Sequence, residues 1–168
     1  MASQPTHPSR TDALRPEPRP GIPRQLRASI RLWLVAVAAG VFETALVVVD
    51  ATSGEVGSAA EVAVGVAIRL LAFTGLVALA VQLRRGRNWA RVALAVLFGG
   101  LGTLSLVIGP VTWLAEGGSL TDAVAGADLG SVLFAASRVL HLGAVMAALV
   151  LMFHPAANAY LRAPTRAA

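Results

Sequence analysis

Residues 62–83 read VAVGVAIRLLAFTGLVALAVQL, an apolar run in which Arg69 is the single charged residue. A helix of about 20 residues crosses the roughly 30 Å hydrocarbon core of a bilayer, and it satisfies its own backbone hydrogen bonds there. A central Arg costs about 2.5–3.5 kcal/mol on the insertion scale, and each Val, Ile, Leu or Phe offsets about 0.3–0.6 kcal/mol. We therefore predict a transmembrane helix that carries a charge inside it.

Three further runs have the same length and character, at about 30–49, 89–108 and 131–153. The chain is 56% hydrophobic and 14% charged, whereas soluble domains carry about a quarter charged residues. This composition predicts an all-α fold, a bundle of four transmembrane helices within residues 23–162. The Pro- and Arg-rich segment 1–22 and the C-terminal segment 163–168 hold too little apolar surface to offset the entropy of ordering, so we predict disorder in both.

The charges are distributed unevenly over the loops. All 14 basic residues are Arg, and outside the predicted helices they precede the first run, join the second to the third, or follow the fourth. By the positive-inside rule both termini are cytoplasmic, in a multi-pass protein of the inner (plasma) membrane. The net charge of +5 therefore indicates topology and not a nucleic-acid partner. The inner cluster is expected to contact anionic inner-leaflet lipids and consists of Arg84, Arg85, Arg87 and Arg91.

Each predicted helix places a polar group at a similar depth. Glu43, Arg69 and Arg138 all lie roughly 10–12 Å from the outer face at 1.5 Å per residue. Thr103 falls close to this level, and His141 follows one helical turn after Arg138. Because intramembrane charges usually face the bundle interior and pair, we predict that Glu43 accepts hydrogen bonds from Arg69, Arg138 or both.

This charged layer holds two Arg for one Glu, so one positive charge needs a further partner. Arg138 could extend outward to Asp122 or Asp128. A neighbouring protomer could supply an acid, or an anionic ligand could bind. The sequence leaves these three alternatives open.

The first functional interpretation is a non-enzymatic scaffold or partner-binding membrane component, with the Glu/Arg layer as a clamp between helices. The alternative is a small transporter or sensor that binds an anionic lipid or metabolite at Arg69 and Arg138. A proton path through Glu43 and His141 is a third interpretation. Small residues recur at helical spacing at Ala36, Gly40 and Thr44, a surface suited to a homodimer or another membrane protein.

The residue types argue against cofactors and metals. The chain has no Cys, which excludes thiolate ligands and disulfides. His154 lies roughly 20 Å beyond His141 along the same predicted helix, so the two cannot bind one haem. The glycines of 99–102 lack the following Lys of a nucleotide-binding loop. We expect no catalytic residues, metal or cofactor.

Several residues carry local expectations. Trp33 is expected at the inner headgroup level, and Asn88 is expected to cap the third helix. The glycines of 99–102 indicate close packing or a bend, and Pro110 should end or kink that helix.

Two short segments next to the membrane, RGRNWAR at 85–91 and PAANAYL at 155–161, resemble those of a group of small uncharacterised four-helix membrane proteins of actinobacteria. The resemblance covers nearly everything after about residue 28. It implies the four-helix membrane fold and no particular activity.

Overall fold

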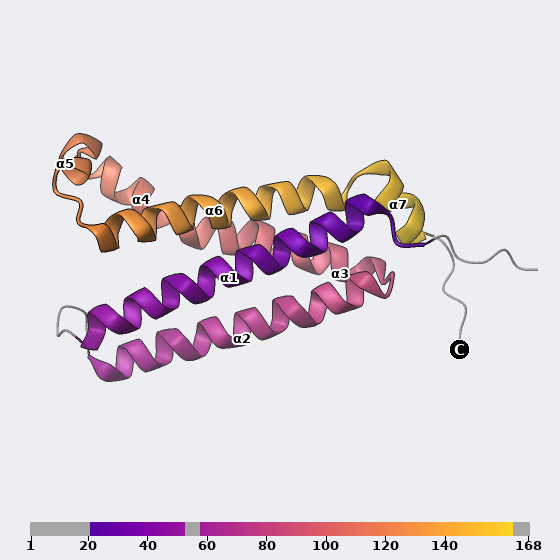
Figure 1. Cartoon of the computed structure of the whole chain (residues 1–168), viewed down its shortest axis with the longest axis horizontal. Helices are drawn as coiled ribbons and strands as arrows, with labels where there is room; N and C mark the ends of the chain where they lie inside the picture. Colours follow the sequence, from indigo (N-terminus) through magenta and orange to yellow (C-terminus); the bar gives the residue numbers. More distant parts are fainter. Residues whose placement is uncertain (1–20, 53–57, 163–168) are drawn as a thin grey trace, which may run out of the picture.

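The structure is a computed structural model that describes residues 21–52 and 58–162, and every regular element in these ranges is a helix (Figure 1). The predicted disordered segments lie outside the described residues, except for residues 21 and 22. Four helices are long and apolar enough to cross a membrane, which confirms the predicted all-helical chain with four helices of membrane-spanning length. They are α1 (Arg24–Thr52), α2 (Ala59–Arg84), the composite Asn88–Ala115 and α6 (Leu129–Met152).

The composite helix has three consecutive parts, α3 (Asn88–Ala93), the π-helical segment η1 (Leu94–Gly102) and α4 (Thr103–Ala115). Two short helices complete the fold, α5 (Leu120–Ala125) and α7 (Pro155–Arg162). All four long helices extend beyond the predicted apolar runs at one or both ends.

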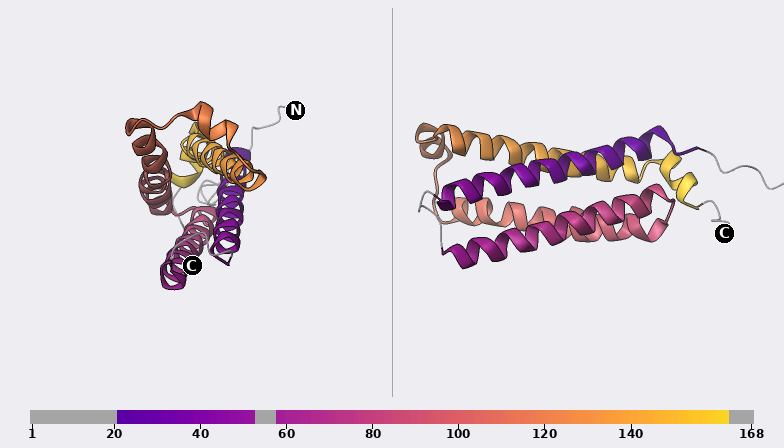
Figure 2. Two further views of the ribbon diagram at one scale, coloured as in Figure 1. Left: turned by 90° about the vertical axis from the view of Figure 1, so that its left-hand side faces the viewer. Right: turned by 60° about the horizontal axis from the view of Figure 1, so that its bottom comes forward.

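Successive long helices run in opposite directions (Figures 1 and 2). The helix α1 packs most extensively on α6 and also on α2, so the last long helix returns beside the first. The helix α2 packs on α3 and η1, whereas α4 packs on α6. The start of α1 and the short helix α7 lie at the same end of the molecule (Figure 1).

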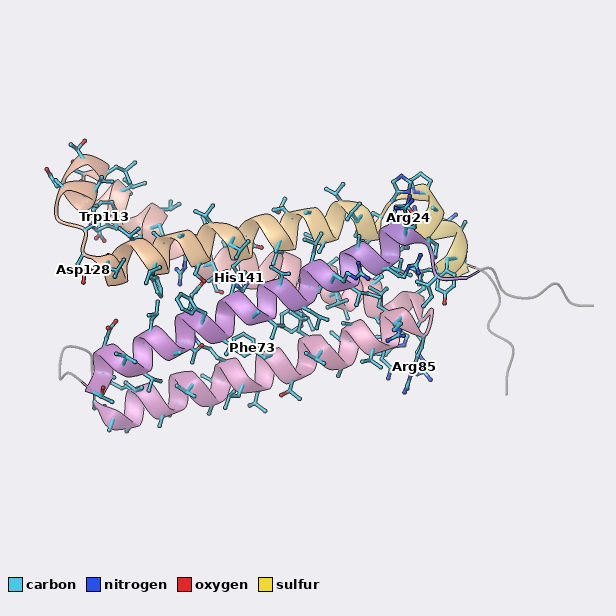
Figure 3. The ribbon with its side chains drawn as sticks, in the orientation of Figure 1. Arg24, Phe73, Arg85, Trp113, Asp128 and His141 are labelled. Atoms are coloured by element: carbon cyan, nitrogen blue, oxygen red, sulfur yellow. The ribbon has the colours of Figure 1, made fainter. Side chains whose placement is uncertain are left out.

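The two ends of the molecule differ in charge. Figure 3 places Asp128 at one end and Arg24 and Arg85 at the other. We call the first the acidic end; its described acids are Asp50, Glu61, Glu116, Asp122 and Asp128. We call the second the arginine end; its described basic residues are Arg24, Arg27, Arg31, Arg84, Arg85, Arg87, Arg91 and Arg162.

Local polar contacts determine where the helices begin. Ser58 and Glu61 form a capping box at the start of α2. Asp128 accepts a hydrogen bond from the Ser131 backbone N–H at 2.8 Å, and the bonds from Ser131 lower the pKa of the Asp128 carboxyl. The cap prediction for Asn88 was wrong, because Arg87 holds the cap position and makes no side-chain cap bond.

The buried core lies mainly toward the arginine end, where Leu26, Leu83, Leu94 and Met152 are fully buried. Trp33 is also fully buried and belongs to this core, so its side chain faces the bundle and not the surrounding headgroups. Because α1 begins at Arg24, Trp33 lies more than two helical turns inside the helix. In contrast, α4 has no buried residue, and the bundle is therefore more open toward the acidic end.

The glycine-rich part of the third span is closely packed. A Cβ atom added to Gly99 would lie 2.9 Å from Leu149 Cδ1, so a larger residue there would require the Leu149 side chain to move. The helix continues through Pro110 as far as Ala115. Of the two predicted effects of Pro110, an end or a kink, the end of the helix is therefore contradicted.

Candidate functional site

A cavity of about 470 Å³ lies between all four long helices. Its size is within the roughly 300–1,000 Å³ typical of small-molecule sites. Most of its lining is apolar, with side chains such as Ala36, Ala72, Phe73 and Phe98. Exposed residues of α2 and α4 also line it, namely Ile68, Arg69 and Ser105, so the cavity opens between these two helices.

The cavity is elongated along α1. Trp33 and Glu43 both line it, and they lie about 15 Å apart along the helix at 1.5 Å per residue. Leu76 and Val145 lie near the Trp33 end, whereas Arg69 and Arg138 lie near the Glu43 end. The cavity therefore has one charged end, toward the acidic end of the molecule, and one apolar end.

An ion pair between α1 and α6 forms part of the charged end. Arg138 Nη2 donates to Glu43 Oε2 at 3.4 Å, and the Glu43 side chain is 8% exposed. The Arg138 guanidinium also lies 4.7 Å from the centroid of the Phe134 ring, a cation–π distance. The nearby Ser137 hydroxyl donates to the Ala39 carbonyl at 3.2 Å and joins the same two helices.

Pro110 supplies a third contact for Arg138. Proline has no N–H, so the carbonyl four residues earlier loses its helical donor. That carbonyl belongs to Leu106, and it accepts from Arg138 Nη1 at 3.3 Å. The helix thus continues past Pro110 and uses the freed acceptor to hold the arginine of α6.

Arg69 lies at the cavity opening without such contacts. Its side chain is exposed, and its guanidinium folds back over Gly65, where an added Cβ would be 3.2 Å from Nη1. It makes no hydrogen bond or ion pair with any residue that the structure describes. Of the two predicted partners, Glu43 therefore pairs with Arg138 and not with Arg69.

His141 lies near the middle of the cavity. Gly40 separates it from Phe73, since a Cβ on Gly40 would be 2.8 Å from the Phe73 ring and 3.5 Å from His141 Cε1. Figure 3 labels Phe73 on α2 and His141 on α6, on either side of α1. His141 Nδ1 has no hydrogen-bond partner among the described residues, contrary to the usual environment of a core histidine.

Three further polar atoms of cavity-lining residues are buried without a partner in the described part of the chain: Trp33 Nε1, Glu43 Oε1 and Arg138 Nε. Buried polar groups are normally hydrogen-bonded. Together with His141 Nδ1 they offer both donors and an acceptor along the cavity wall.

Thr103 is the one predicted layer residue that does not line the cavity. Its Oγ1 is buried without a partner among the described residues, and Gly102 and Ser105 line the cavity in its place. The depth of Thr103 can be predicted from residue counting, whereas the direction in which its side chain points cannot. The π-helical turns of η1 rotate the start of α4 away from the phase of an ideal α-helix.

The inner cluster divides into three exposed arginines and one buried arginine. Arg84, Arg85 and Arg87 are exposed, as Figure 3 shows for Arg85. Arg91 is only 8% exposed and donates from Nη1 to Asn158 Oδ1 on α7. Its guanidinium also lies 4.9 Å from the centroid of the Phe153 ring. The structure therefore contradicts the prediction that Arg91 is available to lipid headgroups, because α7 covers it.

No protein-family model, curated protein or solved structure matches the chain. The function must therefore be argued from the cavity and its charges.

Proposed function

We propose that the chain is a multi-pass plasma-membrane protein whose cavity binds an anionic amphiphile, a molecule with one anionic head and one apolar chain. The four helices of membrane-spanning length support the membrane location. The separation of acidic and arginine ends supports an orientation with the arginine end, and so both ends of the described chain, in the cytoplasm.

The position of the opening supports entry from the lipid. Arg69 lies about 15 Å along α2 from its start at Ala59, and its guanidinium folds back to the level of Gly65, about 9 Å from that start. An opening at this depth, between α2 and α4, faces hydrocarbon. A molecule that reaches it sideways from the bilayer must be largely apolar.

The observation that carries the proposal is Arg69 itself. A cation at this depth usually has an anionic partner, and Glu43, the nearest buried acid on the cavity wall, is bound to Arg138. An anionic head at Arg69, with its chain along the apolar wall toward Trp33, supplies the missing partner and fills the cavity. This proposal corresponds to the small transporter or sensor that was the alternative interpretation of the sequence. The cavity adds a place for the apolar chain of the ligand.

The scaffold interpretation is favoured by a different observation, the Glu43–Arg138 ion pair that joins α1 to α6. A clamp of this kind accounts for Glu43 and Arg138. It gives no role to Arg69, and it does not need a cavity of this size. We therefore rank it second.

Trp33 provides a direct test, because it lies at the apolar end of the cavity. In a Trp89→Phe/Trp113→Phe protein Trp33 is the single remaining tryptophan. Dodecanoate brominated at its last carbon should quench Trp33 fluorescence saturably in lipid nanodiscs. Arg69→Gln should raise the dissociation constant obtained from the quenching curve by at least about tenfold. A tenfold change corresponds to the loss of one charged contact of about 1.4 kcal/mol.

Two controls accompany this test. Arg85→Gln removes an exposed arginine at the other end of the molecule and should leave the quenching curve unchanged. Dodecanoate brominated next to the carboxylate should quench Trp33 less, because its bromine stays near Arg69. If Arg69→Gln binds the probe as tightly as the parent protein, the proposed function is wrong.

A further inference from the structure

We propose, on the basis of the proposed function, that the cavity accepts a head group with a single negative charge and that Glu43 is the residue that imposes this limit. The charged groups that face the cavity are Glu43, Arg69 and Arg138. His141 also faces it, and its imidazole is neutral at pH 8, above the ordinary histidine pKa of about 6.5. The described walls of the cavity therefore carry one net positive charge.

The charge of Arg138 is compensated before any ligand binds. Its guanidinium is held by Glu43 Oε2, by the Leu106 carbonyl and by the Phe134 ring. These three contacts lie on α1, α4 and α6, so Arg138 is fixed from three sides. Arg69, with no such contact among the described residues, is the cation left for a ligand.

A second negative charge on the ligand would meet a carboxylate. Glu43 is buried, lines the same end of the cavity as Arg69, and has Oε1 without a partner among the described residues. Like charges repel strongly where water is excluded, and a buried charge without a counter-charge is costly. Carboxylates and phosphodiesters carry one charge and fit, whereas a phosphomonoester at pH 8 carries two and does not, since its second pKa is about 6.

A matched pair of probes isolates this difference. Dodecyl phosphate is a dianion at pH 8, and its methyl ester is a monoanion with the same chain and the same phosphate. Each probe competes with the brominated dodecanoate for the full-length protein in which Trp33 is the single tryptophan. The methyl ester should compete at least about tenfold better than dodecyl phosphate. Unbrominated dodecanoate tests whether a carboxylate or a phosphodiester is the better monoanion.

Glu43→Gln should reverse the order, because it leaves Arg138 without its counter-charge and raises the net charge of the cavity by one. Glu43→Gln/Arg138→Gln returns the net charge to its original value and should restore the preference for the methyl ester. Arg138→Gln alone makes the cavity neutral and should weaken both probes by at least about tenfold. If Glu43→Gln does not fold, the double variant still tests the charge count, since it contains no unpaired member of the ion pair and a preference for the dianion would overturn the inference.

The outcomes separate this inference from the proposed function. If no probe displaces the brominated dodecanoate, or the dodecanoate itself does not bind, the proposed function fails. If the parent protein binds both phosphates equally, or folded Glu43→Gln keeps the preference of the parent, the cavity binds anions but Glu43 does not set their charge. If the folded double variant prefers the dianion, the charge-counting argument is likewise overturned.

Discussion

Gly40 of α1 lies against side chains of two other helices, α2 and α6. A Cβ atom there would lie 2.8 Å from the Phe73 ring of α2 and 3.5 Å from His141 of α6. We predict that Gly40→Ala destabilises the protein by about 1–3 kcal/mol, the usual cost of overpacking, reduced by up to about 1 kcal/mol of improved helix propensity. The measurement is the midpoint of SDS-induced unfolding in mixed micelles.

Gly143→Ala is the matched control, since nothing lies within 4 Å of a Cβ added to Gly143 on α6. It should be neutral or stabilising by up to about 1 kcal/mol. Phe73→Leu should recover part of the loss when it is combined with Gly40→Ala. Equal stability of the two alanine variants would show that the close approach at Gly40 is not a tight constraint.

At the scale of single residues, the sequence identifies the candidate site by residue type but not by partner. Charges are rare within apolar runs, so Glu43, Arg69 and Arg138 could be found without a structure. Which Arg pairs with Glu43 depends on the rotation of each helix about its axis. Counting residues gives the depth of a side chain but not this rotation. The acceptor that Pro110 frees on Leu106 could be anticipated as a local feature. Its use by Arg138 could not, because that needs the position of α6.

The short helix α7 is held to the rest of the arginine end by a few specific contacts. Arg91 donates to Asn158 and lies against Phe153, and the Tyr160 hydroxyl donates to the Arg84 carbonyl at 3.4 Å. We predict that Arg91→Gln speeds amide hydrogen exchange in α7 by roughly tenfold or more. The physical reason is the loss of a charge-assisted hydrogen bond of about 1.5–3 kcal/mol.

Arg87→Gln serves as the comparison, because Arg87 is exposed in the same turn. An exposed substitution of this kind usually changes stability by less than about 0.5 kcal/mol. Exchange in α7 should therefore stay at the rate of the parent protein. Faster exchange in both variants would mean that the overall charge of the turn, and not the buried contact, holds α7.

Among the elements, the existence of each long helix followed from apolar length alone, whereas the internal form of the third span did not. Pro110 and the glycines of 99–102 signalled an irregular helix. They could not show that the irregularity is a π-helical segment that packs Gly99 against Leu149. That outcome depends on contact with α6, which is distant in the sequence. The π-helical turns also change the rotation of the following helix α4, and Thr103 therefore does not line the cavity.

For the bundle as a whole, the number of long apolar helices could be predicted, because each helix that crosses a bilayer needs about 20 apolar residues. The sequence cannot predict that α1 packs mainly on α6, or that the bundle is tight at the arginine end and open toward the acidic end. Those properties follow from side-chain size at contacts between distant segments. The cavity exists because the bundle is open toward the acidic end.

The proposed orientation, with the arginine end in the cytoplasm, can be tested by cysteine labelling. The chain has no Cys, so a single introduced cysteine reports its own location. Thr121 at the acidic end and Asn88 at the arginine end are both exposed, and neither substitution removes a charge that helps to set topology. A membrane-impermeant maleimide should label Thr121→Cys in intact cells and Asn88→Cys only after permeabilisation. The reverse pattern would place the charged end of the cavity toward the cytoplasmic leaflet. The anionic head that Arg69 attracts would then come from that leaflet, where anionic lipids are enriched, so the labelling result decides which lipid pool supplies the ligand.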